Sequence, residues 1–413
     1  MARSGFTDMV STVLRSAGQR RPRGVERAYC IADLRRMAKR RLPRGPFDYM
    51  DGAAEDEVAL RRNSAGFADY RVVGHTLRDV SEIDTSHTIL GTPSALPILC
   101  SPTGFGRLFH HDGERAVARA AAEAGLIYTL STLGTVSIED VAAAAPSGHR
   151  WFQLYVWKDR AIASDLIARA RSSGYETLVL TVDTPVAGRR ERDYRNGFTI
   201  PPTVGLKTLL DGARKPSWWY GFMTTEPLDF AVVSRYTPGG TGPGGVMGYI
   251  NSQFDQTLSW DDAAAIRDEW AERPSEGGTP RFVIKGVQCV EDARMAAEIG
   301  ADGIMLSNHG GRQLDHAVAP IDLLPEVVDA VGGRTEVIVD GGIRRGTDIL
   351  KALALGADAC SIGRAYLFGL GAGGQAGVTR AFQMLEAELR VAMTLAGCRT
   401  TKEIDSAAIR RSP

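Results

Sequence analysis

Short apolar runs recur along the chain from Leu96 onward, and each ends in a polar residue or a glycine. Runs of this length and composition are typical of strands that are buried on both faces of a parallel sheet. We predict eight such strands: Leu96–Ser101, Ile127–Ser131, Trp151–Tyr155, Thr177–Asp183, Phe282–Lys285, Gly303–Ser307, Glu336–Asp340 and Ala359–Gly363.

Helical patterns separate these runs. Alternating strands and helices predict a parallel sheet, and eight such units favour a closed (β/α)8 barrel, or TIM barrel, over an open doubly wound sheet. The helices expected from apolar spacing are Gly113–Ala124, Ala161–Ser172, Val290–Ile299, Ile321–Val331 and Thr347–Leu355.

The residues before the first strand do not follow this repeat. We expect a helical preface packed on the barrel, with helices at Ile31–Arg41 and Ala54–Asn63. The expected division of the chain is an N-terminal tail at 1–28, the preface at 29–95, the barrel at 96–400 and a C-terminal tail at 401–413.

A second region that does not fit is residues 196–260, a long insertion between the fourth and fifth strands. It contains Pro201-Pro202, the aromatic run Trp218–Met223 and the Gly/Pro-rich stretch Pro238–Gly245. An insertion of this length predicts a lid or a docking surface. The aromatic run could touch a membrane or pack on the side of the barrel, and the pattern leaves both readings open.

Charge and cysteine content limit the classes of partner. The chain has 49 basic and 49 acidic residues, a balance that argues against a nucleic-acid partner. Its 5 cysteines form no CxxC pair and no zinc-like spacing, so we expect a reducing compartment and no metal site. Without an apolar stretch of spanning length, we expect a cytoplasmic protein, with peripheral contact at the inner face of the membrane left open.

Glycine-rich turns with arginines follow the last two predicted strands. Asp340-Gly341-Gly342 leads to Arg344 after strand seven, and Gly363-Arg364 follows strand eight. Active sites of such barrels lie at the carboxyl ends of the strands, and the last two strand ends commonly hold a phosphate. Backbone N–H groups, a helix N-terminus and a guanidinium would supply the contacts, so we predict a phosphate site here.

The end of strand six carries the clearest candidate for catalysis. His309 ends an apolar run and is followed by two glycines and Arg312. Imidazole titrates near neutral pH and suits a general base, which Asp183 from strand four could orient. The planar guanidinium of Arg312 matches a carboxylate. A base beside a carboxylate anchor fits a 2-hydroxy acid substrate.

Lys285, at the end of strand five, has several readings. It could form a Schiff base with a carbonyl substrate, or place a positive charge beside a flavin ring. A buried structural ion pair is the third reading.

The ordered motifs resemble those of the FMN-dependent L-2-hydroxy acid dehydrogenases and oxidases, a family that includes L-lactate dehydrogenase, glycolate oxidase, mandelate dehydrogenase and the flavin domain of flavocytochrome b2. The resemblance runs from about Ile31 to Ile404. The segments that carry it are Phe47-Asp48-Tyr49, Ser101-Pro102-Thr103-Gly104, Leu130-Ser131-Thr132, Phe152-Gln153-Leu154-Tyr155, Thr181-Val182-Asp183, Ile284-Lys285-Gly286, Ser307–Asp315 and the two phosphate turns.

The resemblance implies a role for each matching residue. His309 would be the active-site base, assisted by Asp183, and Tyr155 would bond the substrate hydroxyl. Tyr49 and Arg312 would bind the substrate carboxylate, and Arg190 would be a second arginine near the substrate. FMN and its phosphate would be held by Pro102, Thr103, Gly104, Ser131, Gln153, Thr181, Lys285, Ser307, Asp340, Gly341, Gly342, Arg344, Gly363 and Arg364.

Two positions distinguish members of the family. Leu133 stands where glycolate oxidase has an aromatic residue and flavocytochrome b2 has leucine, which favours lactate as substrate. Gly104 stands where oxidases often carry alanine, which disfavours dioxygen as acceptor. The resemblance thus implies an L-lactate dehydrogenase with a quinone-type acceptor, and a homo-oligomer.

Four alternatives remain at this point. An oxidase of the same acids would release hydrogen peroxide, and a biosynthetic relative would act on a larger 2-hydroxy acid or a modified peptide. A lyase would use Lys285 as a Schiff base and need no flavin, and a non-catalytic barrel would bind no FMN.

Overall fold

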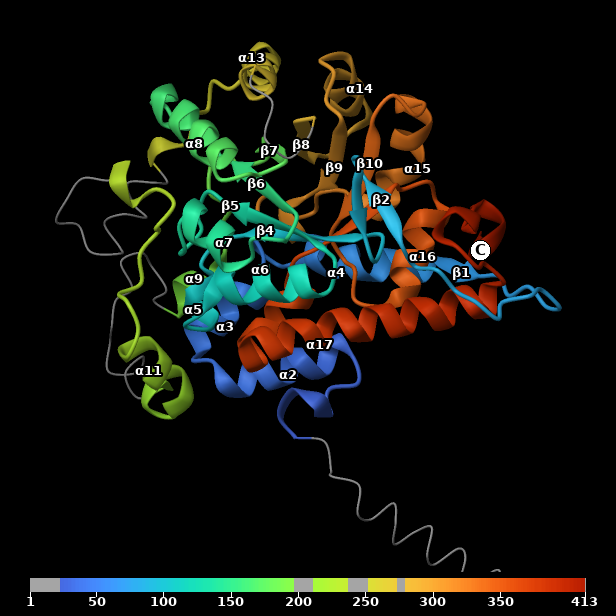
Figure 1. Cartoon of the computed structure of the whole chain (residues 1–413), viewed down its shortest axis with the longest axis horizontal. Helices are drawn as coiled ribbons and strands as arrows, with labels where there is room; N and C mark the ends of the chain where they lie inside the picture. Colours follow the sequence, from blue (N-terminus) through green and yellow to red (C-terminus); the bar gives the residue numbers. More distant parts are fainter. Residues whose placement is uncertain (1–22, 197–210, 237–251, 273–278, 413) are drawn as a thin grey trace, which may run out of the picture.

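The computed structural model describes residues 23–196, 211–236, 252–272 and 279–412. Its centre is a closed barrel of parallel strands in the order β10-β11-β4-β5-β6-β7-β8-β9, which confirms the predicted fold class (Figure 1). The eight strands are β4 (Ile98–Thr103), β5 (Ile127–Ser131), β6 (Arg150–Leu154), β7 (Thr177–Thr181), β8 (Arg281–Val287), β9 (Gly303–Ser307), β10 (Glu336–Asp340) and β11 (Ala359–Ile362).

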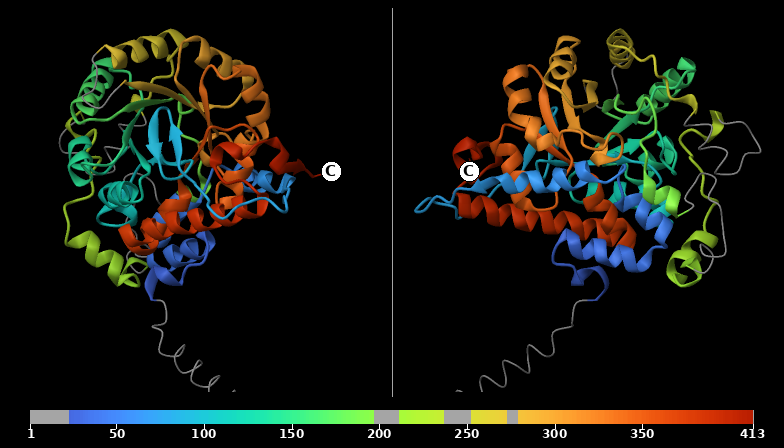
Figure 2. Two further views of the ribbon diagram at one scale, coloured as in Figure 1. Left: turned by 45° about the vertical axis from the view of Figure 1, so that its right-hand side comes forward. Right: turned by 180° about the vertical axis from the view of Figure 1, so that it is seen from behind.

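Helices form a ring around this barrel (Figure 2). The five predicted helices appear with their ends within about one residue, whereas α7, α13 and α17 are additional. The helices of the ring are α6 (Gly113–Glu123), α7 (Ile138–Ala144), α8 (Arg160–Ser172), α13 (Trp260–Ala271), α14 (Val290–Glu298), α15 (Pro320–Val331), α16 (Gly346–Ala354) and α17 (Arg364–Ala396).

The amino end of the barrel is closed by a hairpin of β2 (His87–Ile89) and β3 (Thr92–Ser94). Ile89 and Leu90 of this hairpin pack against one inward-facing residue from every strand of the barrel. The Leu90 N–H also donates to the Glu336 carboxylate at 2.8 Å, at the start of β10. Apolar side chains therefore plug the amino end of the barrel interior, whereas the active sites of such barrels lie at the carboxyl ends of the strands.

The preface consists of α2 (Ile31–Arg41), α3 (Arg44–Asp51) and α4 (Val58–Ala65), and α2 lies along α17 (Figure 1). α3 was not predicted. α4 begins four residues later than the expected helix at Ala54, because Glu55 and Glu57 have φ values of 45° and 60° that a right-handed helix does not allow.

The last strand of the described chain pairs with a strand that follows the preface helices in a small sheet. β1 (Tyr70–Val72) pairs antiparallel with β12 (Ile409–Arg411). Residues 401–413, expected only as a tail, therefore contain a strand that is tied to the preface.

Between β7 and β8 the described residues form α9 (Glu191–Arg195), α11 (Pro216–Met223) and a short turn of helix at Ser234–Tyr236. The motifs at Pro201-Pro202 and Pro238–Gly245 lie outside the described residues. α11 packs beside α5 (Gly106–Phe109), and the Trp218 Nε1–H donates to the Leu108 carbonyl at 2.9 Å. None of the described helices is both long enough and apolar enough to cross a bilayer.

Candidate active site

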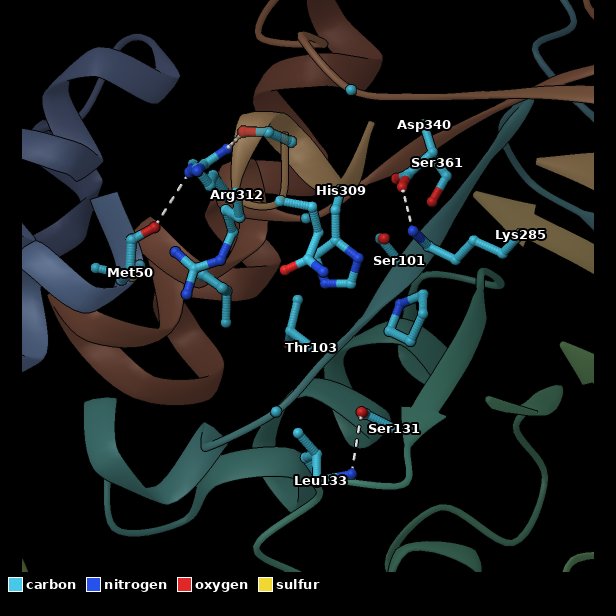
Figure 3. Close-up of a pocket in the computed structure, with 18 of the residues that line it drawn as sticks. Met50, Ser101, Thr103, Ser131, Leu133, Lys285, His309, Arg312, Asp340 and Ser361 are labelled. Carbon is cyan, nitrogen blue, oxygen red and sulfur yellow. Dashed lines mark hydrogen bonds and ion pairs between the residues drawn. The ribbon is translucent and has the colours of Figure 1, made fainter. Parts of the chain in front are cut away.

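A pocket opens at the carboxyl ends of the barrel strands, where most of the predicted site residues meet (Figure 3). The predicted residues that line it are Tyr49, Pro102, Thr103, Gly104, Ser131, Leu133, Tyr155, Arg190, Lys285, His309, Arg312, Asp340, Gly341, Gly342, Arg344, Gly363 and Arg364. The remaining predicted residues, Gln153, Thr181, Asp183 and Ser307, lie behind this wall and are largely buried.

His309 is held in an unusual backbone conformation where β9 ends. Its φ is 56°, and its N–H donates to the Ser307 hydroxyl at 3.0 Å. The ring Nδ1 lies 3.0 Å from an Asp183 carboxylate oxygen. The Asp183 carboxylate accepts a hydrogen bond from the Nδ1–H group, so the lone pair of the neutral ring is on Nε2. A non-glycine residue with positive φ is costly and is typical of functional sites.

The surroundings of His309 keep its ring neutral near pH 7. Burial lowers the pKa of His309 below its ordinary value, and the positive charges of Lys285 and Arg312 act in the same direction. The Asp183 carboxylate opposes this shift but does not overcome it. The ring is therefore available as a base at neutral pH, while Asp183 can stabilise the cation that forms when it takes a proton.

Gly286 is a site residue that the sequence reasoning did not assign. Its φ is 103°, and a Cβ there would lie 2.7 Å from both the Cβ and the Cγ of Asp183. A side chain at this position would displace Asp183 from His309. The only sequence signal is a glycine directly after the lysine that ends a strand.

Two arginines flank the ring of Tyr49. The guanidinium carbon of Arg312 lies 4.7 Å from the ring centroid, and that of Arg190 lies 5.8 Å from it. Arg312 also donates to the carbonyls of Tyr49 at 2.5 Å and Gly52 at 3.0 Å. Within the described part of the chain, neither guanidinium takes part in an ion pair, so both charges can meet an anionic ligand.

Tyr155 lines the same pocket and keeps its proton. Burial raises the pKa of Tyr155, and the negative charge of Asp183 adds to the shift. Its hydroxyl is therefore a neutral hydrogen-bonding group over the physiological range of pH.

Arg344 and Arg364 form a second cationic region at the predicted phosphate turns. Burial lowers the pKa of Arg344 to about 10 and, together with neighbouring Arg312, that of Arg364 to about 9. Arg364 donates to the carbonyls of Met50, Gly52 and Gly310. Neither arginine pairs with a carboxylate among the described residues, so an anion bound here would relieve their mutual repulsion.

The helix whose N-terminus faces the region of Arg344 and Arg364 is α17. Its first turn carries no side-chain cap, and Gly363, Arg364 and Leu367 line the pocket. The start of α16 is instead occupied by Asp348, which accepts from the backbone N–H groups of Arg344 and Arg345. The N–H groups at the start of α17 thus lie with the two arginines at one side of the pocket, an arrangement that suits an anion.

Lys285 is fully buried in a polar triad. Its ammonium lies 2.9 Å from an Asp340 oxygen and donates to the Ser307 hydroxyl at 3.0 Å, and Ser307 donates to Asp340 at 2.8 Å. Burial alone would lower the pKa of Lys285, but the Asp340 and Asp183 carboxylates raise it. A Schiff base needs the neutral amine, so this environment favours a fixed positive charge beside the pocket.

The residues of the pocket fit FMN. Four buried polar atoms beside it lack a hydrogen-bond partner in the described chain: Gln153 Nε2, Thr181 Oγ1, Asp183 Oδ2 and Ser361 Oγ. Such atoms are costly unless a bound group pairs with them. A flavin ring edge offers donors and acceptors for these atoms, and its phosphate suits the site formed by Arg344, Arg364 and α17.

A network behind His309 joins the preface to the barrel. The side-chain amides of Asn63 and Asn308 exchange two hydrogen bonds, at 2.7 and 2.8 Å. Asp315 accepts from the N–H groups of Val58 and Ala59 at the start of α4. Asn308 and Asp315 lie inside a recognised motif, but the partner Asn63 carries no local signal in the sequence.

Gln313 holds the loop that follows β7. Its amide donates to the carbonyls of Asp183 and Val186 and accepts from the Gly188 N–H. This loop leads to Arg190, so Gln313 helps to fix the position of Arg190 at the pocket.

The position of Gly104 is tight. A Cβ on Gly104 would lie 2.9 Å from the Leu133 Cβ and 3.0 Å from the Leu133 carbonyl oxygen. Gly104 and Leu133, the two positions expected to distinguish acceptors and substrates, are therefore in direct contact.

Comparison with known proteins defines the class. Residues 38–411 match the family described as FMN-dependent dehydrogenase. A putative L-lactate dehydrogenase of Mycobacterium tuberculosis is 48% identical, over 91% of this chain and 88% of its own length. An L-lactate oxidase of Nostoc sp. is 44% identical, over 91% and 96%.

A solved structure agrees with these relatives. The monotopic membrane protein (S)-mandelate dehydrogenase superposes with a TM-score of 0.87 at 36% identity, covering 94% of this chain and 100% of that one. The chain belongs to the FMN-dependent L-2-hydroxy acid dehydrogenase and oxidase family. Its cofactor is FMN, and its reaction is the oxidation of a 2-hydroxy acid.

Proposed function

We propose that the protein oxidises L-lactate to pyruvate and passes the electrons to a quinone-type acceptor. The observation that carries this proposal is the arrangement around Tyr49. Arg312 and Arg190 lie against its ring without carboxylate partners among the described residues, and His309 lines the same pocket. A carboxylate anchor and a neutral base in one pocket are what a 2-hydroxy acid requires.

Each residue then has a defined task in the reaction. Arg312 and Arg190 bind the substrate carboxylate, and Tyr155 hydrogen-bonds the substrate hydroxyl oxygen. His309 Nε2 takes a proton from the substrate, and Asp183, 3.0 Å from Nδ1, stabilises the resulting imidazolium. FMN, when bound, supplies the two-electron acceptor, and the Lys285 ammonium favours negative charge on a ring beside it.

Leu133 and the relatives support lactate as the substrate. The Leu133 N–H donates to the Ser131 hydroxyl at 3.1 Å, which holds its backbone at the pocket wall. The relatives in M. tuberculosis and Nostoc are both named for L-lactate. A small apolar wall suits a methyl side chain, although one pocket residue discriminates only modestly between acids.

The surface beside α11 supports an acceptor that is reached at a membrane. Tyr220 and Met223 of α11 are 74% and 71% exposed. A basic and polar surface pocket adjoins the helix start and includes Lys39, Arg44 and Lys215. Exposed aromatic and apolar side chains next to basic ones fit an anionic bilayer surface, and a similar structure is a monotopic membrane protein. We therefore propose that α11 contacts the membrane.

Anaerobic and aerobic turnover of the FMN-loaded protein tests this proposal. L-Lactate should bleach the flavin without oxygen, and a soluble quinone should restore its colour at least tenfold faster than dioxygen does. Glycolate and L-mandelate serve as comparison substrates. Stoichiometric hydrogen peroxide with no gain from quinone would instead identify an oxidase, and preferential bleaching by another acid would replace lactate.

A further inference from the structure

We infer that Phe254 determines specificity by separating the substrate pocket from a second, partly apolar cavity, and so restricts the enzyme to 2-hydroxy acids with short side chains. This inference rests on the proposed function. Phe254 is not part of any motif in the sequence, and it follows a segment outside the described residues.

Phe254 is a shared wall of two cavities. It lines the pocket that contains His309, and it also lines a neighbouring cavity of about 300 Å³. Among the described residues, Thr184 is the only other one common to both. The second cavity has an apolar side formed by Val156, Val182, Pro185, Leu258, Trp260 and Ala263, and its remaining lining, including Thr181, Asp255, Gln256, Ser259 and Asp292, is polar.

The ring of Phe254 stands next to the reacting end of the pocket. It packs edge-on against the Tyr155 ring, with 5.3 Å between centroids and 77° between planes. Phe254 is only 8% exposed, so its ring fills space between the cavities rather than projecting into solvent. A substrate whose hydroxyl meets Tyr155 therefore brings its C2 side chain close to this wall.

The wall is held by its backbone on both sides. Phe254 forms an antiparallel bridge with Trp157, and the Lys158 N–H donates to the Gln253 carbonyl at 2.9 Å. On the other side, the Asp255 N–H donates to the Val156 carbonyl at 3.3 Å, and the Asp255 carboxylate pairs with Arg160 at 2.7 Å. Because the main chain is anchored at both neighbouring residues, the Phe254 ring is a fixed partition. Shortening the Phe254 side chain should therefore join the two cavities without moving the main chain.

A longer aliphatic side chain of a substrate could then reach the apolar side of the second cavity. In the native pocket the extra methylenes of 2-hydroxyhexanoate meet the Phe254 ring, whereas after truncation they can lie among Leu258 and Trp260. A few methylenes in an apolar pocket change the specificity by about tenfold or more. Loss of the ring contact with Tyr155 should affect all substrates equally and cancel in a ratio.

The test compares kcat/KM for L-2-hydroxyhexanoate and L-lactate in FMN-loaded wild type, Phe254→Ala and Leu258→Ala. The ratio should rise about tenfold in Phe254→Ala. Leu258→Ala enlarges only the second cavity and is the matched control, so its ratio should stay within twofold of the wild type. A parallel titration of 2-oxohexanoate and pyruvate, followed by flavin absorbance, should show the same shift in binding without turnover.

The outcomes separate this inference from the proposed function. A ratio in Phe254→Ala within twofold of the wild type, at full FMN content, overturns the role of Phe254. If the wild type oxidises neither acid, the proposed function fails, and the 2-oxo acid titration still decides whether Phe254 limits the pocket. If Phe254→Ala does not retain FMN, Phe254→Leu decides by the same ratio, with a rise of about threefold expected.

Discussion

At the scale of single residues, the charges around the pocket divide into two kinds. Lys285 and Asp340 form a buried ion pair, 2.9 Å apart, that fixes the ammonium charge of Lys285 beside the pocket. Arg312, Arg344 and Arg364 instead donate to backbone carbonyls and retain their charge for a ligand. The base His309 lies between these groups, so its protonation reports directly on the electrostatics of the site.

The pH dependence of catalysis follows from this position. Burial lowers the pKa of His309, so kcat/KM for L-lactate should be constant near pH 7 and fall tenfold per pH unit only below a midpoint lower than the ordinary value of about 6.5. As pH drops through that midpoint the ring takes up a proton and can no longer act as a base. A profile of initial rates between pH 4 and 8 measures the midpoint.

His309→Gln is the control for this assignment. The variant should retain FMN but lose about 10²- to 10⁴-fold in kcat, with no acid limb of the same midpoint. An acid limb that is unchanged in the variant would assign the titration to another group.

A residue could be predicted from the sequence to belong to the site where its side chain lies at the end of a strand. His309, Lys285 and Asp340 were recognised because each follows or ends a buried apolar run, which places it at the pocket. Gly286 and Phe254 could not be recognised in this way. Their effects come from contacts with Asp183 and Tyr155, residues distant in sequence, and no local pattern encodes those contacts.

At the scale of elements, α11 is the exposed helix with the clearest consequence. Substituting Tyr220→Ser and Met223→Ser together should weaken binding to anionic vesicles by tenfold or more, because it removes two apolar side chains that could enter the interface. Co-sedimentation with vesicles containing phosphatidylglycerol measures this. Turnover with a soluble quinone should be unchanged.

The chain offers a matched control at the opposite end of the molecule. Val391 and Leu395, near the carboxyl end of α17, are 59% and 67% exposed (Figure 1). Val391→Ser with Leu395→Ser removes a similar apolar area and should leave vesicle binding intact. Equal losses in both double variants, or no loss in either, would contradict a specific contact through α11.

The pattern of elements was predictable for the barrel and much less so around it. Continuous apolar runs identified every barrel strand because both faces of each strand are buried. α17 escaped prediction because glycines interrupt its pattern, and its backbone departs from helical geometry at Gly373 and Gly374. The pairing of β1 with β12 involves strands of 3 residues from distant parts of the chain, which is too short for any periodicity.

At the scale of the whole molecule, FMN should contribute to stability as a ligand of the folded state. At 100 times its Kd, a ligand that binds only the folded protein adds about 2.7 kcal/mol to the free energy of unfolding. FMN should therefore raise the melting temperature more than riboflavin, which lacks the phosphate. Thermal melts of the flavin-free protein with each compound measure the difference.

The variant Arg344→Met should separate the stability of the flavin-free protein from its affinity for FMN. Burial lowers the pKa of Arg344 to about 10, so its charge opposes folding at neutral pH until an anion binds. The variant should melt no lower than the flavin-free wild type but bind FMN about tenfold to a hundredfold more weakly. Arg345→Met is the control, because Arg345 is exposed and pairs with Glu388 at 2.7 Å. Equal FMN affinity in the two variants would remove Arg344 from the phosphate site.

The hydrogen bonds from Arg364 to the preface constrain when this site can form during synthesis of the chain. Its side chain reaches the carbonyls of Met50 and Gly52, which were synthesised 314 and 312 residues earlier. The phosphate site and the wall behind it therefore cannot be completed on the ribosome until nearly the whole polypeptide has emerged. We therefore expect FMN to bind at the end of synthesis or after it, and a chain that stops short of α17 should lack the proposed phosphate site.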